Sequence, residues 1–248
     1  MNLENARRLI ARLPSEALVL DVGGGASPFP RADYVIDALP FEAAGAGSNE
    51  SVHRSLNLSP RYSPDTWVQH DLCSRTPLPF SDRQFDFVVC SHLLEDVRDP
   101  IGVCGELMRV GKAGYIEVPS RIEEQSLGVE HPLYAGYYHH RWLISNENET
   151  LVFRHKPHNL HSVRSAIVMK LKPGWKVNPA HAIVTLEWND TLAFEERLEF
   201  SEAKTKSELI EFAQRSRQLP LLRVPVPMSV NTRLKRHLYF WRLERGRD

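Results

Sequence analysis

The chain has 248 residues, of which 42% are hydrophobic and 25% are charged, and 31 lysines and arginines balance 31 aspartates and glutamates. This composition is typical of a globular protein of one large or two small domains, and it excludes a disordered or collagen-like chain. The balanced charge gives no overall reason to expect a nucleic-acid partner. No stretch reaches the roughly 18 uninterrupted apolar residues of a membrane-spanning helix, and the first residues lack the apolar core of a signal peptide, so we expect a cytoplasmic protein.

The first half of the chain alternates helical and strand patterns. Apolar residues at helical spacing predict a helix over 3–13, which Pro14 ends. Asp99 and Pro100 predict the start of a second helix, and Gly111 its end. Five aliphatic runs predict strands at 17–22, 34–37, 66–70, 85–90 and 114–118. Because these strands alternate with helical segments, they predict a parallel sheet covered on both faces.

The second half of the chain differs from the first in composition and periodicity. Residues 120–140 are rich in His, Tyr, Glu and Ser with little periodicity, which predicts a long functional loop or lid. Strand-like runs around polar turns predict two hairpins, over 141–154 and over 183–195. Ser207 is expected to cap a helix that continues to about residue 218. An extended proline-rich connector and a last helix over 229–243 complete the prediction.

A strand that runs into consecutive glycines is typical of a site for a nucleoside. Here the glycines are Gly23, Gly24 and Gly25, and Asp37 closes the next strand, where a carboxylate can accept both ribose hydroxyl protons. The pattern lacks the third glycine of the dinucleotide fingerprint, because Ser27 and Pro28 stand where a phosphate-binding helix would begin. This difference points away from NAD.

Several motifs in a fixed order make the family more specific. They are an acidic residue at 71, Leu-Pro-Phe at 78–80, Phe-Asp at 85–86, His-Leu-Leu-Glu at 92–95, Asp-Pro at 99–100 and Glu-Leu-Met-Arg-Val at 106–110. Over residues 17–119 the chain resembles the class I S-adenosylmethionine-dependent methyltransferases. The resemblance implies S-adenosylmethionine as the cofactor and an α/β, doubly wound, Rossmann-like fold. Its sheet would be seven-stranded and mostly parallel, with an antiparallel terminal hairpin.

The expected organisation is a single methyltransferase domain with an insertion. Residues 1–119 would form the cofactor-binding half, residues 120–182 an inserted substrate lid, and residues 183–248 the terminal hairpin and C-terminal helices. The resemblance also implies roles for single residues in binding the cofactor. They are Asp21, Gly23, Gly24 and Gly25 under the methionine part, Asp37 on the ribose, Asp71 and Leu72 on the adenine, and Ser91 and His92 at the donor methyl.

The sequence departs from the family pattern in two places. The interval from Asp21 to Asp37 is short for a strand, helix and strand, and it holds two prolines, so we expect the first helix to be vestigial. Asp96 stands where the pattern has a second histidine, so that position is not expected to take part in the chemistry.

The acceptor of the methyl group has to be inferred from residues outside the cofactor motifs. The chain has no Asn/Asp-Pro-Pro-Tyr signature and no Pro-Cys nucleophile, which disfavours methylation of bases. Aromatic faces together with His, Glu and Arg suit a polyhydroxylated ligand, although such rings also pack into cores. We therefore expect an O-methyltransferase for a sugar or another small polar metabolite. The expected substrate-binding residues are His131, Tyr134, Tyr137, Tyr138, Arg141 and Trp142.

A weakly acidic hydroxyl needs a base, and a neutral imidazole suits that task. His139 or His140 is the expected base, because they lie beside Tyr138 and Arg141, with Glu117 and His92 as substitutes. No metal is predicted. A divalent metal held by His131, His139, His140 and a carboxylate stays an alternative.

The basic C-terminal segment gives a second hypothesis. Its lysines and arginines, with three aromatic residues among them, would let the helix over 229–243 dock RNA or a protein substrate. The apolar stripe of the same helix instead favours packing on the body or on a second subunit. We therefore expect a small-molecule acceptor and not a nucleic-acid partner, and a homodimer formed by this stripe stays an alternative to its packing on the body.

Overall fold

The computed structural model describes residues 1–25, 27–43, 56–74, 76–221 and 223–225. The chain divides into two compact units. The first comprises Met1–Val118, Ile144–Phe153 and Val184–Glu196, and the second comprises Pro119–Leu143, Arg154–Ile183 and the residues from Arg197 onward. Each unit is described by itself.

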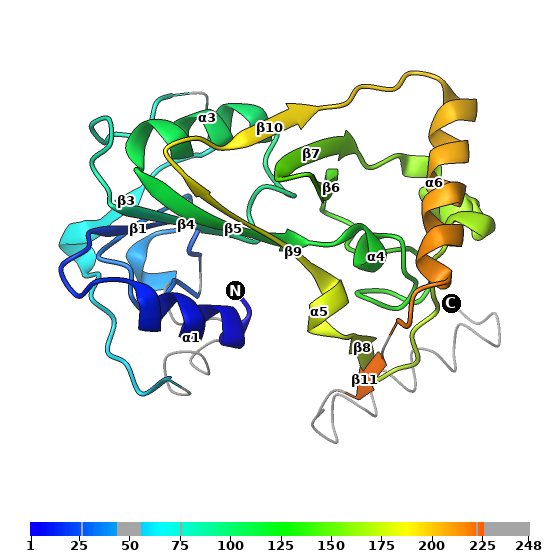
Figure 1. Ribbon diagram of the computed structural model, residues 1–248, viewed down its shortest axis with the longest axis horizontal. Helices are drawn as coiled ribbons and strands as arrows, with labels where there is room; N and C mark the ends of the chain where they lie inside the picture. The colour runs from blue at the N-terminus through cyan, green and yellow to red at the C-terminus, as the bar shows by residue number, and fades with distance from the viewer. Residues whose placement is uncertain (26, 44–55, 75, 222, 226–248) are drawn as a thin grey trace. The chain divides into compact units, whose positions relative to one another are not determined.

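A six-stranded sheet carries the first unit, in the order β3-β2-β1-β4-β5-β9 (Figure 1). Its strands are β1 Val19–Val22, β2 Tyr34–Asp37, β3 Trp67–Gln69, β4 Phe87–Ser91, β5 Ala113–Pro119 and β9 Ile183–Asn189. The first five pair in parallel. Backbone bonds from Ser120 N to Ala182 O and from Asp190 N to Lys112 O show that β9 runs antiparallel to β5. The predicted doubly wound, mostly parallel α/β fold is confirmed.

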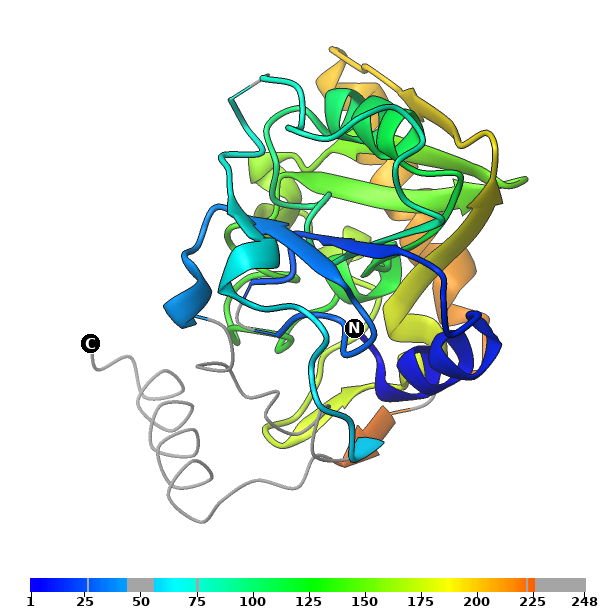
Figure 2. The same cartoon turned by 90° about the vertical axis from the view of Figure 1, so that its left-hand side faces the viewer.

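Two helices cover opposite faces of this sheet (Figures 1 and 2). Helix α1 spans Leu3–Arg12, and the Asn2 side chain caps it by accepting hydrogen bonds from Glu4 N and Asn5 N. Helix α3 spans Pro100–Val110 and begins as predicted, with the Asp99 side chain accepting from Gly102 N. Burial of Ala6 and Leu9 in the core of the first unit holds α1 on the sheet.

No helix connects β1 to β2 in the described part of that interval, which confirms the vestigial first helix. The chain between the two strands is held instead by side chains that accept backbone N–H groups. Asp21 Oδ2 accepts from Phe29 N at 2.6 Å, and Asp33 Oδ2 accepts from Val19 N at 2.8 Å. Two short 3₁₀ turns, η1 Phe41–Ala43 and η2 Pro64–Thr66, lie on the way to β3.

The strand count and the terminal hairpin differ from the prediction. The main sheet has six strands among the described residues, not seven. Strand β10, Ala193–Glu196, does not form a hairpin with β9 but pairs in parallel with β7, Thr150–His155. The predicted hairpin over 141–154 is present: β6, Trp142–Glu147, neighbours β7, and a tight turn at Asn148 and Glu149 with positive φ joins them.

The second unit is built of short elements and one long helix. They are α4 Arg121–Glu124, η3 His158–Ser162, η4 Arg164–Ala166, β8 Trp175–Val177, α5 Pro179–Ala182, α6 Glu202–Arg217 and β11 Arg223–Pro225. Leu209 of α6 joins a core with Leu143 and Leu160. The helix begins earlier than predicted, because Ser201 and not Ser207 is its cap and accepts from Lys204 N.

The predicted basic helix over 229–243 lies outside the described residues, and so does the RNA- or protein-docking hypothesis that depends on it. Among the residues that are described, no helix has both the length and the apolar character needed to cross a membrane.

Candidate functional site

The glycine turn after β1 brings the backbone to the carboxyl edge of the sheet. Gly23 and Gly25 have φ angles of +77° and +52°, which favour glycine. A Cβ on Gly23 would lie 2.9 Å from the side chain of Leu93, so the turn has no room for a side chain there. This edge is where open parallel sheets bind ligands, next to the point at which the strand order reverses between β1 and β4.

Two buried aspartates shape this turn. Asp37, at the end of β2, accepts from Gly25 N at 2.8 Å and from Leu39 N at 2.7 Å. Asp21 is 3% exposed, and burial raises its pKa to about 7. A carboxylate has about four acceptor positions, so Asp37 can hold the backbone and still accept ribose hydroxyls. The structure thus places Asp21, Gly23, Gly24, Gly25 and Asp37 together.

His92 follows β4, and its ring lies between two carboxylates. Its Nδ1 is 3.5 Å from Glu95 Oε1, and its Nε2 is 3.3 Å from Glu117 Oε1. Only a ring protonated on both nitrogens can donate to both carboxylates. Burial acts to lower the pKa of His92, but the hydrogen bonds to Glu117 and Glu95 outweigh it and raise the pKa to about 9. The ring is a cation at neutral pH, which disfavours it as the base.

Glu117 is fully buried and surrounded by donors. Its oxygens accept from Asn2 N at 2.6 Å, Asn5 Nδ2 at 2.8 Å and Tyr115 OH at 2.6 Å. Burial acts to raise its pKa, but His92, Tyr115 and the other donors lower the pKa to about 2. A carboxylate that binds its proton so weakly is a poor general base. Glu117 is better suited to holding the His92 ring in place.

Two polar atoms beside this cluster have no hydrogen-bond partner among the described residues: Ser91 Oγ and Glu95 Oε2. Ser91 is the last residue of β4, and Glu95 is 1% exposed. Buried polar atoms are nearly always satisfied, so both are candidates to contact a ligand. The sequence alone indicates only a structural role for Glu95, because acids at this place in the motif usually fix helix ends.

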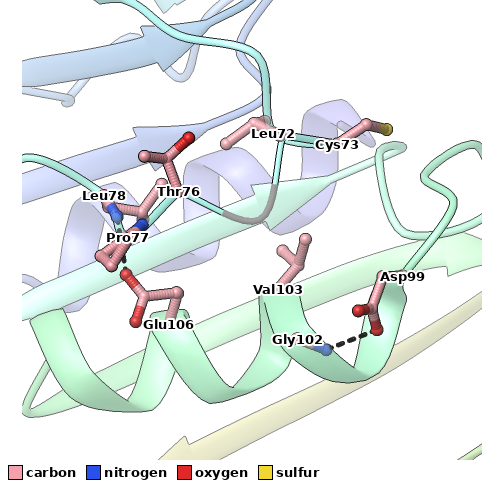
Figure 3. Close-up of a pocket in the computed structure, with 9 residues that line it drawn as sticks. All are labelled: Leu72, Cys73, Thr76, Pro77, Leu78, Asp99, Gly102, Val103 and Glu106. Atoms are coloured by element: carbon pink, nitrogen blue, oxygen red, sulfur yellow. Dashed lines mark hydrogen bonds between the residues drawn. The ribbon is translucent and has the colours of Figure 1, made fainter.

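The predicted adenine-reading pair, Asp71 and Leu72, follows β3. Asp71 is exposed, and its Oδ1 accepts from Cys73 N at 2.8 Å. Leu72 and Cys73 line a cavity of about 420 Å³, as do Thr76, Pro77 and Leu78, and Val103 points toward it from α3 (Figure 3). Of the predicted pair, Leu72 therefore lines this cavity.

These residues fit the cofactor that the resemblance implies. The glycine turn gives close backbone approach, and Asp37 offers charged acceptors. Ser91 Oγ and Glu95 Oε2 are polar atoms without a described partner at the same edge of the sheet. The individual cofactor contacts stay predictions.

The second unit holds the predicted substrate-binding residues, and Glu130 organises the loop that carries them. Its Oε2 accepts from Tyr138 N at 2.9 Å and from Tyr134 OH at 3.2 Å, and its Oε1 is 3.9 Å from His139 Nδ1. The His131 ring stacks on Tyr134 with centroids 4.5 Å apart. The exposed fraction differs along the loop: Tyr138 is 74% exposed, Arg141 is also exposed, Tyr137 is half-buried, and Trp142 is buried.

A buried ionic cluster of Glu124, His140 and Lys156 lies at the base of this loop. Glu124 Oε1 is 2.7 Å from His140 Nδ1, and Glu124 Oε2 is 2.5 Å from Lys156 Nζ. Lys156 also donates to Tyr137 O at 2.7 Å, and all three residues are at most 8% exposed. Sequence reasoning expected His140 but missed its two partners. Glu124 lies 16 residues before it and Lys156 lies 16 residues after it, and no local pattern in the sequence connects them.

Comparison with known proteins identifies a family. A family model described as a methyltransferase domain matches residues 2–161. No curated protein matches the chain. Similar solved structures include a SAM-dependent methyltransferase from Aquifex aeolicus, with 21% identity, 52% of this chain and 70% of that chain covered, and a TM-score of 0.35.

Two further structures are similar at the same level. An S-adenosylmethionine-dependent methyltransferase from Mesorhizobium loti has 17% identity, with 62% of this chain and 67% of that chain covered and a TM-score of 0.33. The YcgJ protein from Bacillus subtilis has 21% identity, with 47% and 51% covered and a TM-score of 0.33. This chain spans about half the length of several solved chains that it matches. The family assignment rests on the family model and on the motifs.

Proposed function

Because the chain belongs to the family of class I S-adenosylmethionine-dependent methyltransferase domains, we propose that it transfers a methyl group to a hydroxyl of a sugar or another small polar metabolite. The cofactor of this family supplies a methyl group on a sulfonium, which is already an activated leaving group. The tasks left to the protein are positioning the reactants, excluding water and removing the hydroxyl proton.

The cofactor side of the proposal uses the first unit. Asp37 would accept hydrogen bonds from the ribose hydroxyls, and Asp71 and Leu72 would contact the adenine. The glycine turn would hold the methionine part of the cofactor. Support comes from the placement of these residues at the carboxyl edge of one parallel sheet.

The acceptor side uses the loop of the second unit. Tyrosine and histidine rings there lie close to Glu130, and rings with neighbouring charged groups suit the C–H faces and hydroxyls of a saccharide. Tyr137 packs its ring against that of His140, with centroids 4.4 Å apart. This arrangement supports a polyhydroxylated acceptor near His140.

The observation that carries the proposal is the bond between Glu124 and His140. A carboxylate on Nδ1 fixes the proton of a neutral imidazole there and makes Nε2 the basic atom, as in the dyads of hydrolases. Lys156 balances the charge of Glu124, so the imidazole is not required to be the cation. The bond from Glu124 therefore supports His140 in the role of base.

The test is a screen for release of S-adenosylhomocysteine with sugar, phenol and carboxylic-acid acceptors. With the best acceptor, His140→Ala should lower kcat about a hundredfold or more and leave cofactor affinity intact. His139→Ala, the matched control on the neighbouring exposed ring, should keep most of the activity. Methylation of acids alone, or full activity in both His140→Ala and His139→Ala, would contradict the proposal.

Two further outcomes would revise it. Loss of activity in His139→Ala instead of His140→Ala would move the base by one residue. Loss of activity with EDTA and recovery with Mg²⁺ would indicate that these imidazoles and carboxylates bind a metal. The proposal also includes a cytoplasmic location and a homodimer, the latter to be tested by sedimentation of the purified chain.

A further inference from the structure

Glu95 is a buried carboxylate with too few donors. Its side chain is 2% exposed, Oε1 makes only the 3.5 Å contact with His92 Nδ1, and Oε2 has no hydrogen-bond partner among the described residues. A buried charge without donors is costly, because the water that solvates it in the unfolded chain is not replaced. Glu95 is therefore poised to receive a cation or a donor that is not part of the described chain.

The second carboxylate of the cluster shows the contrast. Glu117 is equally buried but accepts from Asn2 N, Asn5 Nδ2 and Tyr115 OH within 2.8 Å, and its Oε1 is 4.0 Å from the amino group of Met1. Its charge is fully compensated inside the protein. Of the two carboxylates that flank His92, Glu95 is the one with an oxygen that has no described partner.

The position of Glu95 indicates which ligand it would contact. It follows β4 by four residues, and Ser91 at the end of that strand carries the second buried atom without a described partner. The carboxyl ends of β1 and β4 flank the switch point of the sheet, where this class of fold binds its ligand. The cofactor of the family carries a sulfonium cation, and its product, S-adenosylhomocysteine, carries a neutral thioether in the same place.

We propose that Glu95 discriminates between the charged cofactor and the neutral product. Its carboxylate favours binding of the sulfonium donor over binding of the neutral thioether. In a site shielded from water, a carboxylate attracts a nearby cation far more strongly than it does in bulk solvent. His92, as a cation facing the same carboxylate, weakens this preference. The inference rests on the cofactor of the proposed function and is independent of the acceptor.

Calorimetric titration with S-adenosylmethionine and S-adenosylhomocysteine tests the proposal without any acceptor. Glu95→Gln keeps the shape and removes the charge, so it should weaken binding of the donor about fivefold or more and change binding of the product less than about twofold. His92→Gln removes the opposing cation and should shift the ratio of the two affinities in the opposite direction, toward the donor.

A control variant removes a charge from the opposite end of the same strand. Asp86 precedes β4, lies at the surface and pairs with Lys112 at 2.7 Å. Asp86→Asn should leave the ratio of affinities unchanged, because solvent screens this distant charge. Melting temperatures of all three variants would show whether each one folds.

Three outcomes would overturn the inference. The first is a folded Glu95→Gln variant in which donor and product affinities change equally. The second is a shift of the ratio in the same direction in both variants, which would indicate a change of shape and not of charge. If Glu95→Gln does not fold, an unchanged ratio in His92→Gln is the third. A wild-type chain that binds neither ligand would overturn the proposed function as well.

Discussion

Asp37 joins the backbone of the glycine turn to the end of β2 through Gly25 N and Leu39 N. Asp37→Ala should weaken S-adenosylmethionine binding at least about tenfold, since hydrogen bonds to a charged group contribute about 1.5–3 kcal/mol each. It should also lower the melting temperature, because two backbone N–H groups lose their acceptor.

Asp37→Asn separates these two effects. The amide keeps one acceptor oxygen for one of the two backbone N–H groups but has no charge, so it should restore part of the stability and little of the affinity. Calorimetry and thermal melting of both variants are the measurements. Wild-type affinity in Asp37→Ala would show that the ribose site lies elsewhere.

Asp21 makes stability depend on pH. Burial raises its pKa from 3.8 to about 7, so between these values the unfolded chain releases a proton that the folded chain keeps. The stabilisation of the folded state from this group is complete below about pH 4 and is lost as pH rises toward 7. Above pH 7 the buried carboxylate is charged and destabilises the fold.

Asp21→Asn should remove this dependence, and its amide oxygen can still accept from Phe29 N. The melting temperature of the variant minus that of the wild type should therefore increase from pH 4.5 to pH 7.5. A difference that stays constant over this range would mean that Asp21 is ionised in the fold throughout.

At the scale of elements, β10 shows where a sequence pattern is ambiguous. Residues 183–195 read as two strands around a short turn, and both strands exist. The alternating pattern identifies a strand but not its neighbour, because a partner is chosen by the edge that is open in the folded molecule. Here β10 pairs with β7, so the second strand of the expected hairpin belongs to another sheet.

Two glycines of adjacent elements give a matched test of packing. A Cβ on Gly114, in β5, would lie 2.6 Å from Val88 O and 2.7 Å from the Trp188 ring, whereas a Cβ on Gly105, in α3, would meet nothing within 4 Å. Gly114→Ala should lower the free energy of unfolding by about 1–3 kcal/mol through overpacking. Gly105→Ala should raise it by about 0.5–1 kcal/mol through helix propensity.

Denaturant titration of the two variants measures both changes. Equal effects of the two substitutions would contradict the contact between β9 and β5 at Trp188, on which the order of the sheet depends in this region.

At the scale of the whole molecule, residues 120–182 are predicted to act as a lid over the cofactor. Leu133 and Tyr138 in this segment are 56% and 74% exposed and accessible to chymotrypsin. Cleavage of the protein alone should begin within 120–150 and should slow when cofactor and acceptor bind together. Mass spectrometry of the fragments locates the cuts.

Phe200 supplies the internal reference for that experiment. It is 91% exposed and lies outside the predicted lid, so its cleavage rate should not change on ligand binding. Cleavage confined to the termini, with or without ligands, would indicate that the segment is a rigid part of the core.

The sequence by itself determined the features that depend on neighbours along the chain. Periodicity and capping residues such as Asp99 located the strands of the parallel sheet and α3. The prolines between Asp21 and Asp37 predicted that no full helix forms there, as the described part of this interval shows. The ordered motifs identified the family, since they lie close together in the chain. These are local signals, and local conformational preferences are readable one segment at a time.

Only the tertiary structure decided which distant groups share an environment. Three features depend on contacts between remote segments: the strand that pairs with β10, the contacts of Glu124 with His140 and Lys156, and a Glu95 oxygen without a described partner near a fully satisfied Glu117. The sequence shows that a residue is an aspartate or a glutamate, but it does not show how far the charge of the carboxylate is compensated by its neighbours. Burial and the number of donors set that compensation, and both arise only when the chain packs.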